Sequence, residues 1–133
     1  MRVVDCKKHL EYKIAGGRNL PSDDLLSELF LEAMLWVCNK CVPNELVRQA
    51  ESASESGARV YRNVENGLFI RYPEKPNFSD DKRHLMIDEP LTFAVINYVA
   101  FLIEKEPIYK IEANEIISEF IANDGKEMGV WLG

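Results

Sequence analysis

The feature that most constrains this chain is an apolar run at positions 91–103, interrupted only by Thr92 and Asn97. A helix that is apolar on every face is buried, either in a protein core or in a membrane. The run is shorter than the roughly 20 residues that cross a bilayer. We therefore expect a helix that other parts of the same protein enclose on every side.

Two helices are expected ahead of this run. Residues 3–14 carry apolar side chains at helical spacing, and the following glycines, Gly16 and Gly17, can end a helix. Residues 22–41 continue the apolar pattern after Ser22, which is a good N-cap. Two aspartates in the first turn of that segment favour the positive end of the helix dipole.

Proline and acidic residues mark the remaining helix boundaries. Pro43 breaks the second helix and can start a short turn. Asp88 is expected to be the N-cap of the apolar helix. Pro107 opens a last amphipathic helix, and we expect that helix to stop near Asp124 and Gly125.

A β-hairpin is expected in the middle of the chain. Residues 60–64 and 68–72 are rich in β-branched and aromatic side chains, and Asn66-Gly67 lies between them. Asn-Gly is the strongest short-range signal for a tight hairpin turn. The sequence thus predicts a mainly α protein, a small bundle of about four to five helices with one β-hairpin insertion.

Composition points to a single folded domain over residues 1–133, with residues 126–133 as a flexible C-terminal arm. The net charge of −6 makes sequence-specific nucleic-acid binding a poor expectation. We expect no membrane association, because no apolar stretch is long enough to span a bilayer and the N-terminus runs into Asp5, Lys7 and Lys8 instead of an apolar signal core. Three cysteines are too few for a disulfide framework and fit the cytoplasm.

One set of residues could bind a metal. Cys6 and His9 form one closely spaced pair, Cys38 and Cys41 form another, and together they could supply four ligands to zinc. The alternative is that these side chains belong to the core, because all four fall on expected helices. The Cys-x-x-Cys pair ends a helix, which disfavours a redox-active thiolate.

We expect no enzyme and no cofactor. His84 follows Lys82 and Arg83 in a polar loop without a nucleophile motif. The glutamates of the last helix, Glu112, Glu115 and Glu119, share one helix face, and that pattern usually marks the solvent side. No glycine-rich phosphate loop is present in the sequence.

The sequence contains more apolar helix surface than one small core needs, so we expect a partner to cover part of it. A monomer with an unusually apolar core is the alternative. The residues expected to contact a partner are those outside the main apolar stripe of the second helix and those of the C-terminal arm: Leu31, Leu35, Trp36, Val130, Trp131 and Leu132.

The order of these parts over residues 20–124 resembles the head-tail connector, or adaptor, proteins of tailed bacteriophages. The resemblance rests on the acid-capped helix that begins at Ser22 and carries Trp36, on the hairpin at 60–72, and on the acidic residues that open the apolar helix at 87–91.

This resemblance implies a virion structural protein that is assembled in the host cytoplasm. Such a protein would form a homo-oligomeric ring of about twelve copies. The ring would contact the portal protein on one side and tail proteins on the other. Two other functions stay open: a small cytoplasmic regulatory or antitoxin-like partner protein, and a zinc-binding domain that uses the four ligands named above.

Overall fold

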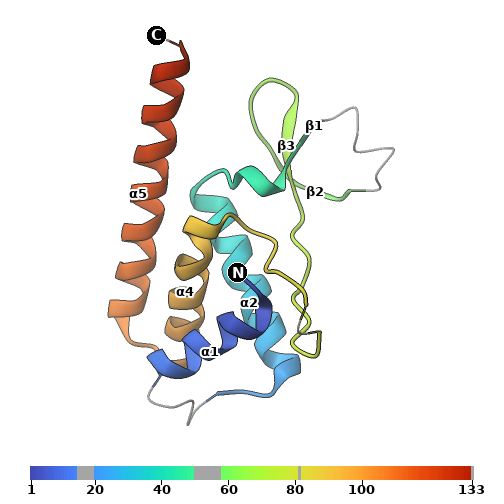
Figure 1. Ribbon diagram of the computed structural model, residues 1–133, viewed down its shortest axis with the longest axis vertical. Coiled ribbons are helices and arrows are strands. Elements are labelled where there is room, and N and C mark those ends of the chain that lie inside the picture. The colour runs from blue at the N-terminus through green and yellow to red at the C-terminus, as the bar shows by residue number, and fades with distance from the viewer. Residues whose placement is uncertain (15–19, 50–57, 81, 133) are drawn as a thin grey trace.

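The protein is mainly α-helical with a small β-sheet at one end, as a computed structural model shows (Figure 1). The structure describes residues 1–14, 20–49, 58–80 and 82–132, with side chains described as far as Asn123. Its α-helices are α1 (Val3–Lys13), α2 (Asp23–Lys40), α4 (Thr92–Glu104) and α5 (Pro107–Leu132). Two 3-10 helices, η2 (Asn44–Leu46) and η3 (Glu89–Leu91), and three strands, β1 (Val47–Gln49), β2 (Val60–Asn63) and β3 (Leu68–Arg71), complete the described part. The predicted fold class is confirmed.

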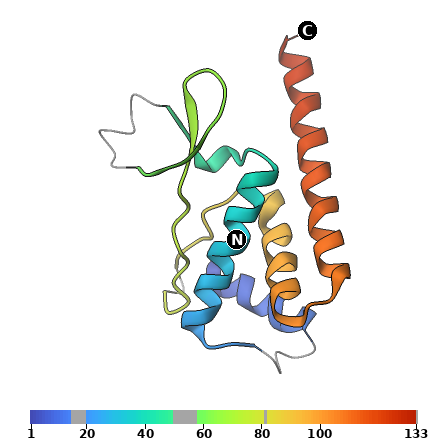
Figure 2. The same cartoon turned by 180° about the vertical axis from the view of Figure 1, so that it is seen from behind.

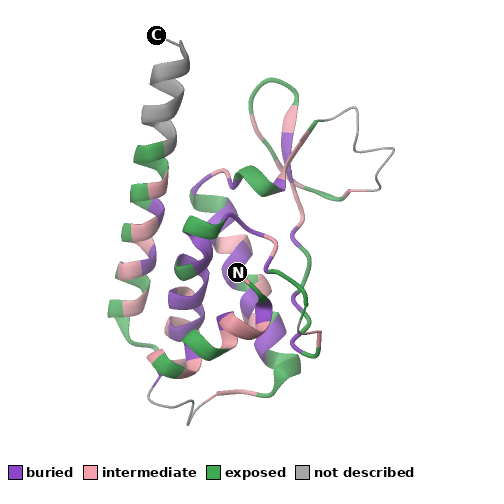
Figure 3. Cartoon of the chain, in the orientation of Figure 1, coloured by how far each residue is buried: buried purple, intermediate pink, exposed green. Residues whose placement is uncertain are grey.

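Helix α4 is the centre of the bundle, where it contacts α1, α2 and α5. Its buried apolar side chains are Ala94, Val95, Ile96, Val99 and Ala100. Figure 3 shows most of α4 in the colour of buried residues. The central position follows from the apolar pattern, since only the middle of the bundle hides so much of one helix from water.

The expectation that this helix is enclosed on every side is wrong at its two ends. Phe93 in the first turn is 39% exposed, where its ring meets the edge of His9 on α1. In the last turn, Leu102 and Ile103 are only half-buried. The ends of α4 therefore reach the surface of the domain, while its middle forms the core.

The N-terminal helices have the predicted boundaries. The hydroxyl of Ser22 accepts a hydrogen bond from the Leu25 N–H at 3.5 Å, so this residue caps α2 as expected. Residues at the start of α1 are fixed by the loop ahead of α4, because the Val3 N–H donates to the Arg83 carbonyl at 2.9 Å. The predicted glycine stop after α1 lies outside the described residues.

Asp88 does not cap the helix that follows it, so that prediction is wrong. Its carboxylate accepts hydrogen bonds from the N–H groups of Asn44 and Glu45, each at 2.8 Å. Because these N–H groups open η2, Asp88 caps a helix far away in sequence. The bundle and the start of the sheet segment are joined through this buried side chain.

The sheet has the strand order β1-β3-β2, and both pairs are antiparallel. The hairpin turn is confirmed, since Asn66 (φ 62°) and Gly67 (φ 72°) both have the positive φ that a type I′ turn needs. Strand β1 was not expected, and it pairs with β3 through Val47 opposite Ile70. A second small core of Cys38, Leu46 and Ile70 connects the sheet to α2.

The sequence predicted that helix α5 ends near Asp124 and Gly125, and that prediction is wrong. The helix continues to Leu132 and extends past the end of α4 (Figures 1 and 2). The side chains of residues 124–133 lie outside the described part, and so do the contacts predicted for Val130, Trp131 and Leu132. In the part of the chain that is described, no helix is both long and apolar enough to cross a bilayer.

Candidate interaction surfaces

The four possible zinc ligands are not arranged as a metal site. Cys6 and Cys41 are buried in the main core, and Cys38 is buried in the small core beneath the sheet. His9 is exposed on α1, where its ring packs edge-on against Phe93 with 5.1 Å between centroids. Among the described residues, no group of three or more His, Cys, Asp or Glu side chains could hold a metal ion. The core interpretation therefore fits the three cysteines better than the zinc interpretation.

The buried thiols are poor nucleophiles. Burial raises the pKa of Cys6 to about 11 and that of Cys38 to about 11. In Cys41 the thiol lies 3.5 Å from the Val37 carbonyl at the C-terminal end of α2, where the helix dipole disfavours a thiolate. Cys6, Cys38 and Cys41 form no disulfide bond. The geometry gives no support to thiol chemistry at the Cys38-x-x-Cys41 pair.

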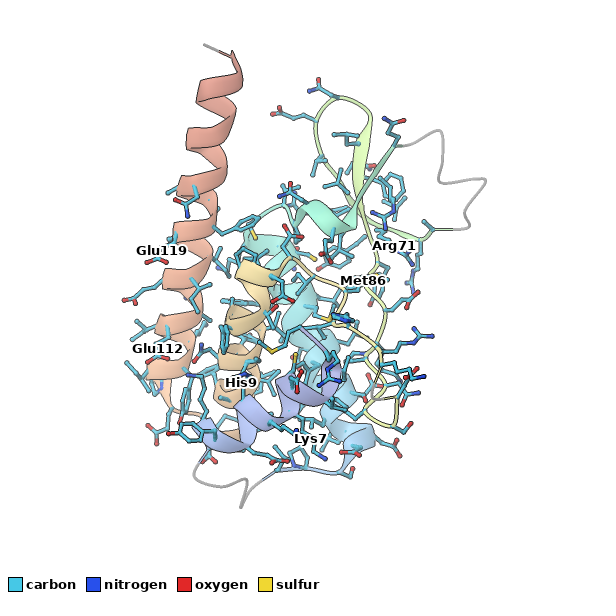
Figure 4. All side chains as sticks on the ribbon, in the orientation of Figure 1. Lys7, His9, Arg71, Met86, Glu112 and Glu119 are labelled. Carbon is cyan, nitrogen blue, oxygen red and sulfur yellow. The ribbon has the colours of Figure 1, made fainter. Side chains whose placement is uncertain are left out.

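The other titratable side chains singled out in the sequence do not converge. Figure 4 shows His9 on α1, Glu119 on α5 and Arg71 in the sheet at separate places on the molecule. His84 is exposed in the loop before α4. Glu112 is half-buried, and its carboxylate lies 3.7 Å from the Lys13 ammonium. These positions suit solvated or ion-paired side chains rather than a shared site.

Outside the core, the main feature of the structure is apolar surface that is exposed to solvent. One part of this surface is a groove on α2. We call this hollow of about 390 Å³ the α2 groove. Its walls come from the outer face of α2 and from one residue after β3: Leu25, Glu28, Leu29, Leu31, Glu32, Leu35 and Tyr72. Helical periodicity explains the groove, because α2 buries the opposite face, with Leu26, Phe30 and Val37, in the core.

The charged residues around the α2 groove differ in their pairing. Glu28 pairs with Lys75 at 2.7 Å, whereas Glu32 makes no ion pair with the residues that the structure describes. Burial, and then the nearby charge of Glu32, raise the pKa of Tyr98. On the sheet side, the Arg59 guanidinium lies 4.4 Å from the centre of the Tyr72 ring. The α2 groove thus carries two carboxylates among its leucines, and only that of Glu28 has an ion pair with a described residue.

The α2 residues that were predicted to contact a partner differ in whether their side chains already pack against other residues of the domain. Leu31 and Leu35 are half-buried and line the α2 groove. Trp36 stacks on Tyr98 of α4, with 4.1 Å between ring centroids and 13° between ring planes. The same indole lies 5.7 Å from the Lys40 ammonium. One face of the Trp36 ring is therefore covered by its own domain. Leu31 and Leu35 are the better candidates for contact with a partner.

A second apolar surface lies on α5 and was missed in the sequence. Ile108, Ile111 and Ile121, which we call the α5 isoleucines, are 53%, 52% and 48% exposed. The helix packs on the core through other residues, chiefly Ala113 and Ile117. The glutamate row was taken as the solvent side, yet isoleucines share that side. The available signal was that α5 has more apolar positions than one stripe can hold.

A third apolar surface lies on the outer side of α1. It consists of Met1, Asp5, Lys8, His9 and Tyr12, which line a shallow hollow that we call the α1 face. Tyr12 is 89% exposed, an unusual position for so large an aromatic side chain. Asp5 pairs with Arg2 at 3.1 Å. Lys8 is exposed and has no ion pair among the described residues.

The fold and these surfaces define a mainly α-helical domain whose distinctive chemistry is exposed apolar surface on α1, α2 and α5. Compared with models of protein families, with curated proteins and with solved structures, the chain matches none.

Proposed function

We propose that the protein is a non-enzymatic structural subunit that functions as a homo-oligomer. The observation that carries this proposal is the large apolar surface left exposed on three separate elements. Each large aliphatic or aromatic side chain contributes about 1.5–3 kcal/mol when it is fully removed from water. Large apolar side chains that gather on an exposed helix face mark an interaction site more often than ones scattered singly over a surface. Removal of this surface from water is therefore expected to stabilise an assembly.

The particular assembly that we propose is the head-to-tail adaptor ring of a tailed bacteriophage virion. In that role the ring would join the portal protein to the tail proteins after assembly in the host cytoplasm. The support is the resemblance in the order of elements: a capped helix, a hairpin, an apolar helix and a final helix. The acidic net charge of −6 and the exposed apolar surfaces fit a subunit whose partners are proteins.

The test is the size and shape of the purified protein at several concentrations. We expect light scattering to give a mass of many copies and electron microscopy to show closed rings. A stable dimer, or a complex with one different protein, would favour the regulatory or antitoxin-like alternative. A monomer at all concentrations would contradict the proposal.

Virion association is tested separately from self-assembly. Particles produced with an epitope-tagged chain are labelled with antibody and viewed by electron microscopy. We expect the label at the single vertex where head and tail join. Rings that form in solution but never label virions would keep the oligomer and exclude the adaptor role.

A further inference from the structure

We propose that the α2 groove of one copy receives the α1 face of a second copy, with Tyr12 in the groove and Lys8 beside Glu32. The inference rests on the proposed homo-oligomer and specifies which surfaces of two copies meet. It commits to one contact among the three exposed apolar surfaces.

Shape and chemistry make the α2 groove a suitable acceptor for an aromatic side chain. The hollow of about 390 Å³ is larger than a tyrosine side chain. Leucine side chains form most of its walls, and Leu25 at its edge is 52% exposed. Tyrosine is enriched at protein interfaces because it buries a large apolar area at little cost in conformational entropy and carries a polar tip.

Charge selects the α1 face as the occupant. Within each surface, one charge is already neutralised: Glu28 by Lys75 in the groove, and Asp5 by Arg2 on α1. Among the residues that line the two surfaces, the side-chain charges without an ion pair to any described residue have opposite signs, a carboxylate on Glu32 and an ammonium on Lys8. Lys8 precedes Tyr12 by one helical turn, so both side chains project from the same side of α1.

The α5 isoleucines are a weaker candidate for the same groove. Their exposed charged neighbours on α5 are Lys110 and the glutamates Glu115 and Glu119, so carboxylates outnumber the one ammonium. Placing these carboxylates beside Glu32 would bring like charges together, which costs free energy at an interface. The α1 face is therefore the apolar surface whose charge matches the groove.

The positions of the two surfaces determine what kind of assembly the contact builds. Figure 1 shows α1 on the near side of the bundle with α2 behind it, and Figure 2 shows α2 on the near side. The two helices lie on opposite sides of the bundle (Figures 1 and 2), and in the proposed contact the groove and the α1 face therefore meet different neighbours. Each copy uses its groove with one neighbour and its α1 face with another, and such a heterologous contact closes into a ring or continues as a filament.

The test is charge reversal with rescue, read by light scattering and sedimentation. The Glu32→Lys and Lys8→Glu variants are each expected to weaken self-association about tenfold or more, because like charges then face each other. Combining the two substitutions should restore most of the affinity. Tyr12→Ala is expected to weaken association to a similar degree. Glu65→Lys, at the exposed hairpin turn, is the matched control and should assemble as the wild type does.

Folding is checked by the melting temperature, which should not change because Lys8, Tyr12 and Glu32 are all exposed. If the wild type forms rings and the single variants form the same rings with the same affinity, this contact is wrong while the proposed oligomer stands. Failure of the double variant to recover would also contradict the Lys8–Glu32 pairing. If the wild type is a monomer, both the contact and the proposed function fail.

Discussion

At the scale of single residues, Asp88 is the side chain whose role extends furthest from its place in the sequence. Its carboxylate accepts the N–H groups of Asn44 and Glu45, each at 2.8 Å, and so fixes the start of η2 against the loop that leads into α4. A buried carboxylate that accepts hydrogen bonds from two backbone N–H groups is costly to remove, because both donors lose their partner.

We expect Asp88→Ala to lower the free energy of unfolding by about 1–2 kcal/mol, the usual range for loss of a capping side chain. Asp88→Asn retains one acceptor oxygen and should lose less. Urea unfolding followed by circular dichroism measures both values, with Glu65→Ala as a surface control. An alanine variant as stable as the wild type would mean that solvent replaces the carboxylate without cost.

The cysteines give a second prediction at this scale. With pKa values of about 11 for Cys6 and Cys38, about one thiol in a thousand is ionised at pH 8. We expect the folded protein to react with a thiol reagent such as DTNB only as fast as it opens, and all three cysteines to react at once in urea. Rapid labelling of one thiol in the native protein would show that it is accessible.

Residue-level reasoning from sequence succeeded where the partner is local and failed where it is distant. Ser22 caps the helix that it immediately precedes, and its partner Leu25 is three positions away. Asp88 also precedes a helix, so the same rule assigned it a local role. Its partners are more than forty positions away. Nothing in the local pattern distinguishes these two cases.

At the scale of elements, the hairpin between β2 and β3 depends on its two-residue turn. Gly67 has φ 72°, and a Cβ added there would meet no atom within 4 Å. A substitution at this site therefore acts through the backbone alone. β-branched residues resist positive φ most strongly, and asparagine tolerates it best among non-glycine residues.

Gly67→Val is expected to destabilise the protein by about 1–2 kcal/mol, and Gly67→Asn by less. The difference between the two variants, measured by urea unfolding, isolates backbone strain because neither new side chain enters an occupied space. Equal stabilities for Gly67→Val and the wild type would mean that the turn can change its conformation at no cost.

The elements themselves were largely predictable, with failures that have physical causes. Long segments with helical periodicity, such as α2 and α4, can be predicted from the sequence because each buries a wide apolar face. Strand β1 has only three residues, too few for an alternating pattern, and its register is set by pairing with the distant β3. The end of α5 was misplaced because Gly125 lowers helix propensity without preventing a helix.

At the scale of the whole molecule, the apolar excess seen in the sequence is present but distributed differently from the expectation. The middle of α4 and the inner face of α2 contribute many apolar residues to the core, while α1, α2 and α5 keep large side chains on their outer sides. The sequence shows that α5 has more apolar positions than one stripe can hold, but not that the α5 isoleucines and Tyr12 are the exposed side chains, because which face of a helix meets the core depends on how the helices pack.

The C-terminal part of the chain gives a prediction that separates folding from assembly. Deleting residues 126–133 should leave the melting temperature of the isolated domain unchanged, because the α5 side chains that the structure describes in contact with the core precede the cut: Tyr109, Ala113, Ile116, Ile117 and Phe120. The deletion removes Val130, Trp131 and Leu132, the residues expected to contact a partner.

Assembly of the shortened chain is therefore expected to fail in light scattering, even though the domain itself stays folded. Trp131→Ala in the full-length protein is the matched variant and should weaken assembly in the same direction, since tryptophan buries a large area for few rotatable bonds. A large drop in the melting temperature of the shortened chain would instead show that this segment stabilises its own domain. Unchanged assembly of both variants would exclude these three residues as partner contacts. The contact between the α2 groove and the α1 face would then be the proposed interface that remains.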